Sequence, residues 1–241
     1  MKKRTKAYHD IEFINSKDAR ALRILAEYLE PKARFEQHGL DDTIVFFGSA
    51  RSRPGSKYYE AARQLAFRLT EWSKALPSKA RRFVVTTGGG PGIMEAANRG
   101  ASEAKGLTAG IGISIPVEQT DNAYITRGLS FHFHYFFMRK FWFAYLAKAM
   151  IVFPGGFGTL DELFESLTLV QTKKMKKRMP IVLFGKDYWD EVVDFEALVR
   201  HGTISPEDVR LVHRTDSVDE AFAWVTQQLT EHAIGRPGAM L

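Results

Sequence analysis

The sequence predicts an α/β fold, namely a Rossmann-like, doubly wound parallel sheet with helices on both faces and an appended N-terminal helical segment. Three observations predict it. Short apolar segments alternate with segments of helical periodicity along most of the chain. The short segments are continuously apolar, as in strands that are buried on both faces. Glycine-rich turns follow three of them, and ligands of such sheets bind at the carboxyl ends of the strands.

The composition is that of a globular protein. The chain has 241 residues, of which 45% are hydrophobic and 26% charged, so that global disorder is excluded. It has no cysteine, which excludes disulfides, thiol catalysis and cysteine-based metal sites. No apolar run approaches the roughly 20 residues that span a bilayer, and we expect a cytoplasmic protein without membrane contact. The net charge of +6 permits an anionic partner without naming one.

Two regions are expected. Residues 1–40 are predicted to be a helical extension that packs on the main domain. An apolar stripe at helical spacing runs through this charged segment: Leu22, Ile24, Leu25, Tyr28 and Leu29. Residues 41–241 are predicted to form the main, Rossmann-like domain.

The main domain is expected to alternate strands and helices throughout. It begins with a β-branched and aromatic strand at 43–47, which ends in Gly48-Ser49-Ala50-Arg51. Apolar spacing then predicts helix 59–72, strand 83–86, helix 93–104 and strand 107–115. The second half is predicted to contain helix 136–148, strand 149–153, helix 160–171, strand 180–184, a further strand near 209–212, and helices 188–199 and 218–229.

The turn Gly88-Gly89-Gly90-Pro91-Gly92 joins a predicted strand to a predicted helix. It is not a dinucleotide fingerprint, because Glu95 or Ile93 stands where the third glycine should be, and it lacks the Gly-Lys-Ser/Thr ending of a Walker A loop. NAD-dependent and ATPase functions therefore lose support. Two interpretations remain, a bare backbone that approaches an anion at a helix N-terminus and a tight turn without a ligand.

The segment Pro154-Gly155-Gly156-Phe157-Gly158-Thr159-Leu160-Asp161-Glu162 follows another predicted strand. Its glycines free N–H groups to face a phosphate, and the Thr159 hydroxyl and the following helix add further attraction. Thr159 and Glu162 also have the spacing of a capping box, in which both side chains satisfy helix N-terminal donors. Capping and catalysis both remain open for the carboxylates, and the two roles can be divided between Asp161 and Glu162.

Eight aromatic residues fall within 131–143, with Arg139 and Lys140 among them. A cation among aromatic side chains binds phosphate or carboxylate groups or extends to the surface. His132 and His134 lack an evident third ligand, so no metal site is predicted. The five cations within 173–178 are predicted to be the solvated end of the preceding helix. Nucleic acid is not expected as a partner, because no nucleic-acid-binding module is recognisable.

These motifs together resemble the LONELY GUY (LOG) family of cytokinin riboside 5′-monophosphate phosphoribohydrolases, with AMP nucleosidase-like proteins, a family also labelled "possible lysine decarboxylase". Its hallmark Pro-Gly-Gly-x-Gly-Thr-x-x-Glu matches residues 154–162 at every fixed position, and its Arg-Lys pair matches Arg139-Lys140. Gly88–Gly90 and Gly48-Ser49 resemble two further glycine turns of the family. The resemblance covers about residues 43–200. The N-terminal 40 residues resemble the longer bacterial branch.

The resemblance implies hydrolysis of the N-glycosidic bond of a nucleoside 5′-monophosphate to free base and ribose 5-phosphate, with Glu162 and Arg139 as catalytic residues. The family's usual His before the Arg-Lys pair is absent, so AMP is as plausible a substrate as a cytokinin nucleotide. The implied substrate-binding residues are Gly48, Ser49, Gly89, Gly90, Lys140, Gly155, Gly156, Gly158, Thr159, Asp161 and Thr168.

The resemblance implies no metal and no organic cofactor, and a homodimer or higher oligomer with sites near the interface. No Schiff-base lysine site for pyridoxal phosphate is evident, so lysine decarboxylation is not expected. The alternative is a molybdenum-cofactor carrier protein of related fold, which binds a nucleotide-like ligand without converting it.

Overall fold

The computed structural model describes residues 5–114 and 122–238. Its strands form one all-parallel sheet in the order β4-β3-β2-β1-β5-β6-β7. This confirms the predicted Rossmann-like α/β class. The strands are β1 (Thr43–Phe47), β2 (Val84–Thr87), β3 (Thr108–Ile113), β4 (Ser130–Phe133), β5 (Ala147–Val152), β6 (Ile181–Phe184) and β7 (Val212–Thr215).

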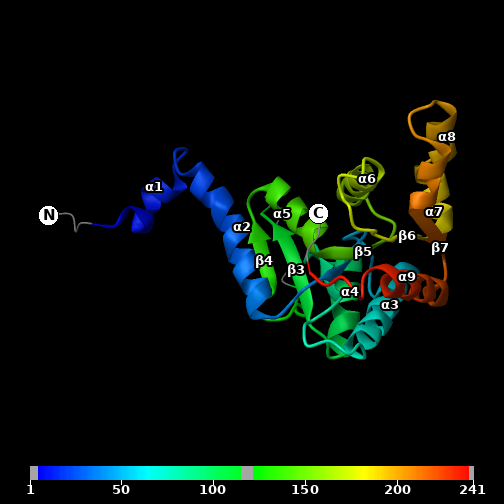
Figure 1. Ribbon diagram of the computed structural model, residues 1–241, viewed down its shortest axis with the longest axis horizontal. Coiled ribbons are helices and arrows are strands. Elements are labelled where there is room, and N and C mark those ends of the chain that lie inside the picture. The colour runs from blue at the N-terminus through cyan, green and yellow to red at the C-terminus, as the bar shows by residue number, and fades with distance from the viewer. Residues whose placement is uncertain (1–4, 115–121, 239–241) are drawn as a thin grey trace.

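Helices cover both faces of the sheet (Figure 1). They are α1 (Ile11–Asn15), α2 (Arg20–Gln37), α3 (Lys57–Lys74), α4 (Ile93–Glu103), α5 (Phe136–Leu146), α6 (Phe157–Gln171), α7 (Lys186–Val192), α8 (Phe195–Arg200) and α9 (Val218–His232), with 3-10 turns η1 (Ala7–His9) and η2 (Pro206–Leu211). None of these helices is both long enough and apolar enough to cross a membrane.

The core has two layers because successive side chains of a strand point to opposite faces. Along β1, Ile44 and Phe46 join an apolar cluster with residues of α3, α4 and α9. Val45 and Phe47 join the other cluster, together with Trp142 of α5 and residues of α6 and α7. Every residue of β1 is buried, which explains its uninterrupted apolar sequence.

Several predicted boundaries differ from the structure. The predicted helix 136–148 ends at Leu146, and the next two residues already belong to β5. The predicted helix 188–199 is two helices, since the Asp194 side chain accepts a hydrogen bond from Ala197 N at 2.7 Å and starts α8. Ile115, the end of the third predicted strand, lies outside the described residues.

Strands at the two edges of the sheet were the least well predicted. Strand β4 was not predicted; its exposed and buried residues alternate, and its two phenylalanines belong to a longer segment rich in aromatic residues. The short strand expected at 209–212 lies at 212–215, because η2 occupies the residues before it. Both edge strands have only four residues, so that neither carries a long apolar signal.

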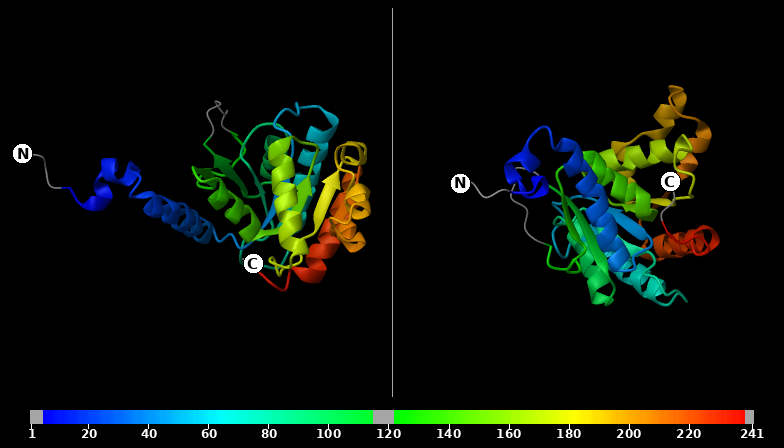
Figure 2. Two further views of the ribbon diagram at one scale, coloured as in Figure 1. Left: turned by 90° about the horizontal axis from the view of Figure 1, so that it is seen from above. Right: turned by 60° about the vertical axis from the view of Figure 1, so that its left-hand side comes forward.

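The N-terminal helix α2 packs on α5 and β4, whereas α1 and η1 extend away from the sheet (Figures 1 and 2). The Glu27 carboxylate accepts hydrogen bonds from the backbone N–H groups of His134 at 2.7 Å and Tyr135 at 3.1 Å. The indole of Trp142 donates to Glu27 O at 3.0 Å. Phe35 packs against Phe131 and Trp142. Helix α2 therefore holds the backbone that leads into α5.

Candidate active site

The predicted glycine turns come together because β2, β1 and β5 are adjacent in the sheet. Their pairing sets Phe46 beside Thr87 and Phe47 beside Val152, so the three strands end at the same edge. A cavity of about 640 Å³ lies there. Eight of the predicted site residues line it: Gly48, Ser49, Arg139, Gly155, Gly156, Gly158, Thr159 and Glu162.

Helix α6 begins earlier than its sequence motif predicts. Gly156 is the N-cap, and the backbone N–H groups of Thr159 and Leu160 both donate to Gly156 O, at 2.9 and 3.1 Å. The Thr159 side chain makes no capping hydrogen bond. The capping-box interpretation of Thr159 and Glu162 is therefore wrong, because both residues lie inside the helix and not at its cap. The first amide groups of a helix lack partners within it, and its positive end favours an anion.

The absence of a side chain at Gly155 shapes this loop. A Cβ atom there would lie 2.1 Å from Thr159 Oγ1 and 2.7 Å from Thr159 Cβ. At Gly158 a Cβ atom would have no neighbour within 4 Å. Only glycine at position 155 allows Thr159 to pack against the start of the loop.

We expect Gly155→Ala to lower the free energy of unfolding by about 1–3 kcal/mol, because Thr159 and the first turn of α6 must shift. Gly158→Ala is the matched control in the same turn, and we expect it to be neutral or stabilising by up to about 1 kcal/mol. Urea denaturation of both variants measures the difference. Equal stability of the two variants would contradict this packing.

Glu162 is a buried carboxylate beside a buried guanidinium. Its side chain is only 8% exposed, and Glu162 Oε1 lies 3.9 Å from Arg139 NH1. Burial raises the pKa of Glu162 to about 7, although the positive charge of Arg139 opposes the shift. In the described part of the chain no donor hydrogen-bonds this carboxylate. Near neutral pH it is therefore divided between a form that accepts a proton and a form that donates one.

Arg139 is fixed from two sides. Its Nε donates to Ile111 O, at the end of β3, at 2.8 Å. Its NH2 group lies only 2.7 Å from the position that a Cβ atom would take at Gly88, so a larger residue there would collide with the guanidinium. Burial lowers the pKa of Arg139, and the charge of Glu162 acts against this. The triple-glycine turn thus contributes through Gly88, which makes room for the guanidinium.

The remaining predicted residues lie outside the lining of this cavity. Lys140 Nζ lies 2.7 Å from Asp161 Oδ2 and 2.7 Å from Glu165 Oε2. Burial opposes the charge of Lys140, but the hydrogen bonds to these two carboxylates raise its pKa. These ion pairs join α5 to α6, and the pair of Lys140 with Asp161 lies one residue along each helix from Arg139 and Glu162.

Three other predicted residues, Thr168, Gly89 and Gly90, also lie outside the lining of the cavity. The Thr168 hydroxyl donates to Phe164 O of its own helix at 2.7 Å and is exposed. Gly89 and Gly90 follow β2, and Gly89 has a positive φ of 75° that favours glycine. Direct substrate contact by these residues stays a prediction.

Several lining residues were not predicted from the sequence. Tyr188 of α7 lines the cavity, and its hydroxyl donates to Gly155 O. Met94 and Arg51 also line it. Tyr188 follows β6, the strand next to β5, so its place after a strand end was the available signal.

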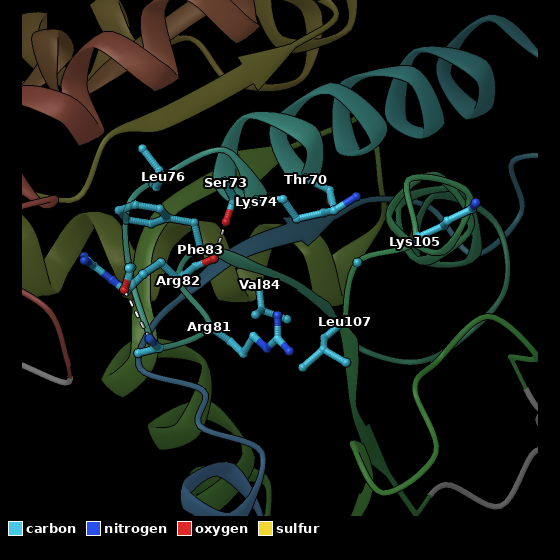
Figure 3. A pocket seen from close by; sticks show the side chains of 13 residues that line it. Thr70, Ser73, Lys74, Leu76, Arg81, Arg82, Phe83, Val84, Lys105 and Leu107 are labelled. Atoms are coloured by element: carbon cyan, nitrogen blue, oxygen red, sulfur yellow. Dashed lines mark hydrogen bonds between the residues drawn. The ribbon is translucent and has the colours of Figure 1, made fainter.

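Two further features do not belong to this site: a basic hollow and a pair of histidines. A hollow of about 300 Å³ lies at the opposite edge of the sheet, where Lys74, Arg81 and Lys105 surround the start of β2 (Figure 3). It contains none of the predicted site residues. Within residues 5–114 and 122–238, no three His, Asp or Glu side chains gather closely enough to hold a metal ion, and His132 and His134 have no third ligand there.

The family model described as "Possible lysine decarboxylase" matches residues 94–225, a span that includes Arg139 and Glu162. The chain belongs to this family. The resemblance to the LONELY GUY proteins is confirmed by distant homologues. Cytokinin riboside 5′-monophosphate phosphoribohydrolase LOG7 of Arabidopsis thaliana is 29% identical to this family member over 210 residues, which cover 84% of this chain and 85% of that protein.

A second phosphoribohydrolase and a solved structure are also similar to this chain. Cytokinin riboside 5′-monophosphate phosphoribohydrolase LOG of Oryza sativa subsp. japonica is 31% identical over 99 residues, 40% of each chain. The solved structure of the Moco Carrier Protein from Chlamydomonas reinhardtii superimposes on this chain with a TM-score of 0.53 at 22% identity. The match covers 79% of this chain and 99% of the carrier protein chain. At this identity the likeness concerns the fold alone.

Proposed function

We propose that the protein hydrolyses the N-glycosidic bond of a nucleoside 5′-monophosphate, AMP or a cytokinin riboside monophosphate, to free base and ribose 5-phosphate. The observation that carries the proposal is the buried Glu162 beside Arg139 in a cavity at the glycine-rich start of α6. The homologous phosphoribohydrolase from Arabidopsis thaliana, which aligns with 84% of the chain, supports the same reaction class.

The 5′-phosphate is proposed to bind at the start of α6. Gly155, Gly156 and Gly158 expose backbone there, Thr159 adds a hydroxyl, and the helix end favours an anion. Arg139 supplies the cation that the cavity needs to hold a phosphorylated ligand. This arrangement brings the anomeric carbon of the ribose toward Glu162.

The chemistry follows from the electron demand of the reaction. The C1′–N bond breaks with its electron pair going to the base, and positive charge develops on the ribose ring. The ionised Glu162 stabilises that charge and takes a proton from the water that attacks C1′. The nitrogen of the leaving base takes up one proton from solvent, and Glu162 returns to solvent the one that it took from water, so that the products are the free base and ribose 5-phosphate. Arg139 keeps part of the Glu162 population ionised at neutral pH.

The test is direct. AMP, GMP, CMP, UMP, dAMP and isopentenyladenosine monophosphate are incubated separately with the pure protein, and free base is resolved by chromatography. We expect base release from at least one monophosphate and none from the matching nucleoside, because the nucleoside lacks the phosphate that α6 would bind. Tight nucleotide binding without release would instead favour a carrier. The absence of both nucleotide binding and base release would overturn the nucleotide assignment.

We also propose that the protein is a homodimer or a higher homo-oligomer. Aromatic side chains near the site are exposed: Phe136 and Phe137 are each 53% exposed, and Phe157 is 92% exposed. Aromatic side chains are enriched at the interfaces between protein subunits. Light scattering after size-exclusion chromatography measures the mass, and a monomer at micromolar concentration would contradict the proposal.

A further inference from the structure

A second basic cavity lies where the parallel strands begin, which we call the amino edge of the sheet. The candidate active site lies at the opposite side, where the strands end. The second cavity has a volume of about 460 Å³ and lies between the start of β5, the segment before β6 and the end of α9. Five cations line it: Lys148, Lys176, Lys177, Arg178 and Arg236. His232 is beside them, and Glu231 is the one carboxylate among the described lining residues.

Two of these cations are buried, and their ammonium groups bond to neutral acceptors. Lys148 is 2% exposed and Lys177 is 7% exposed. Lys177 Nζ donates to Ala144 O at 2.6 Å and Tyr145 O at 2.9 Å, and Lys148 Nζ donates to Arg236 O at 2.9 Å. All three acceptors are neutral carbonyls. In residues 5–114 and 122–238, no carboxylate forms an ion pair with any of the five cations.

The neighbouring charges oppose one another. Burial, together with the positive charge of Lys148, lowers the pKa of Lys177 to about 7. Asp42 attracts both lysines but is already paired with Arg82, whose Nε lies 2.8 Å from Asp42 Oδ2. An anion in the cavity would relieve this repulsion, since charges interact strongly where water is excluded.

Structural capping explains only part of the cluster. Lys177 satisfies carbonyls at the end of α5, where a cation complements the helix dipole. The expectation that the whole run 173–178 is solvated is therefore wrong for Lys177. Capping does not explain Lys176, Arg178 and Arg236, which are exposed and line the same cavity. Their convergence indicates a ligand.

We propose that this cavity binds a small anion with two or more phosphate groups, at a site separate from the candidate active site. The excess of cations over the single carboxylate matches a multiply charged ligand. The volume is that of a small-molecule site. An extended nucleic-acid surface is disfavoured, because Lys173 and Lys174 of the same run lie outside the cavity lining.

The chain offers a matched pair of charge variants for the test. Lys176→Gln/Arg178→Gln and Lys173→Gln/Lys174→Gln each remove two exposed cations from one loop, but only the first pair lines the cavity. Calorimetric titration of the full-length chain with inorganic pyrophosphate at low salt measures binding. We expect the amino-edge component to weaken about tenfold or more in the first variant and less than about threefold in the second.

Further measurements separate this site from the candidate active site. Base release from AMP should be unchanged in Lys176→Gln/Arg178→Gln, and its thermal midpoint should match that of the control pair. Glu231→Gln should strengthen pyrophosphate binding, because it removes the carboxylate. Equal weakening by both pairs would overturn the proposal, as would unchanged binding in the first pair. Tighter binding of a single-stranded oligonucleotide, dependent on Lys173 and Lys174, would also overturn it.

Discussion

Glu162→Gln is expected to reduce base release about 100- to 10,000-fold, the usual contribution of a general acid or base. Glutamine has nearly the shape of glutamate and fits the same buried position, but it neither exchanges a proton nor carries the negative charge that the developing ribose cation requires. Rate measurements with the best monophosphate substrate test this. Full activity of the variant would remove Glu162 from the mechanism.

The same substitution should change stability in a pH-dependent way. The pKa of Glu162 is about 7 in the folded protein and about 4.5 in the unfolded chain. Between these values the folded state binds more protons, so the free energy of unfolding falls as pH rises from about 4.5 to 7. Glutamine does not titrate. The free energy of unfolding of the variant minus that of the wild type should therefore be larger at pH 8 than at pH 4, by on the order of 3 kcal/mol. Urea denaturation at both pH values measures the difference. A pH-independent gap between the two proteins would contradict it.

Arg139→Met is expected to lower kcat/KM about 100- to 1,000-fold, which is typical for the loss of one preorganised electrostatic partner. It should also raise the pKa of Glu162 above about 7, because the charge of Arg139 holds that pKa down. The pH profile of the residual activity should therefore rise at higher pH than in the wild type.

Lys140→Met is the matched control for this change. It removes an equal charge from the next position of the same helix, but Lys140 pairs with Asp161 and Glu165 outside the cavity lining. We expect a loss of less than about tenfold and a smaller shift of the pH profile, since Lys140 lowers the pKa of Glu162 less than Arg139 does. An effect as large as that of Arg139→Met would contradict the assigned roles.

The order of strands and helices was predictable because buried parallel strands need continuous apolar sequence. The glycine turns were predictable as site elements because parallel strands end at one edge. Strand β4 was not, because an alternating four-residue segment among aromatics is equally compatible with a core helix. The start of α6 was placed too late, since glycine disfavours helix interiors but is tolerated in the first turn.

Other features depend on partners distant in sequence. Lys177 reaches carbonyls 32 and 33 residues earlier in the chain, which a local charge run does not reveal. The contact of Tyr188 with Gly155 also joins residues 33 positions apart. Burial raises the pKa of Glu162, and the cavity that it lines is formed by segments distant in sequence, with Gly48, Met94 and Arg139 among them. Motif spacing therefore located the carboxylate but left its chemistry undecided.

The hydrogen bonds of Glu27 have a practical consequence for anyone who shortens this chain. A recombinant protein that starts at residue 41 would leave the backbone amides of His134 and Tyr135 without their carboxylate acceptor and the Trp142 indole without its carbonyl. The segment that leads into the helix carrying Arg139 would then lose these anchoring hydrogen bonds. Loss of activity after such trimming would report a damaged scaffold, even though every residue of the cavity lining was retained.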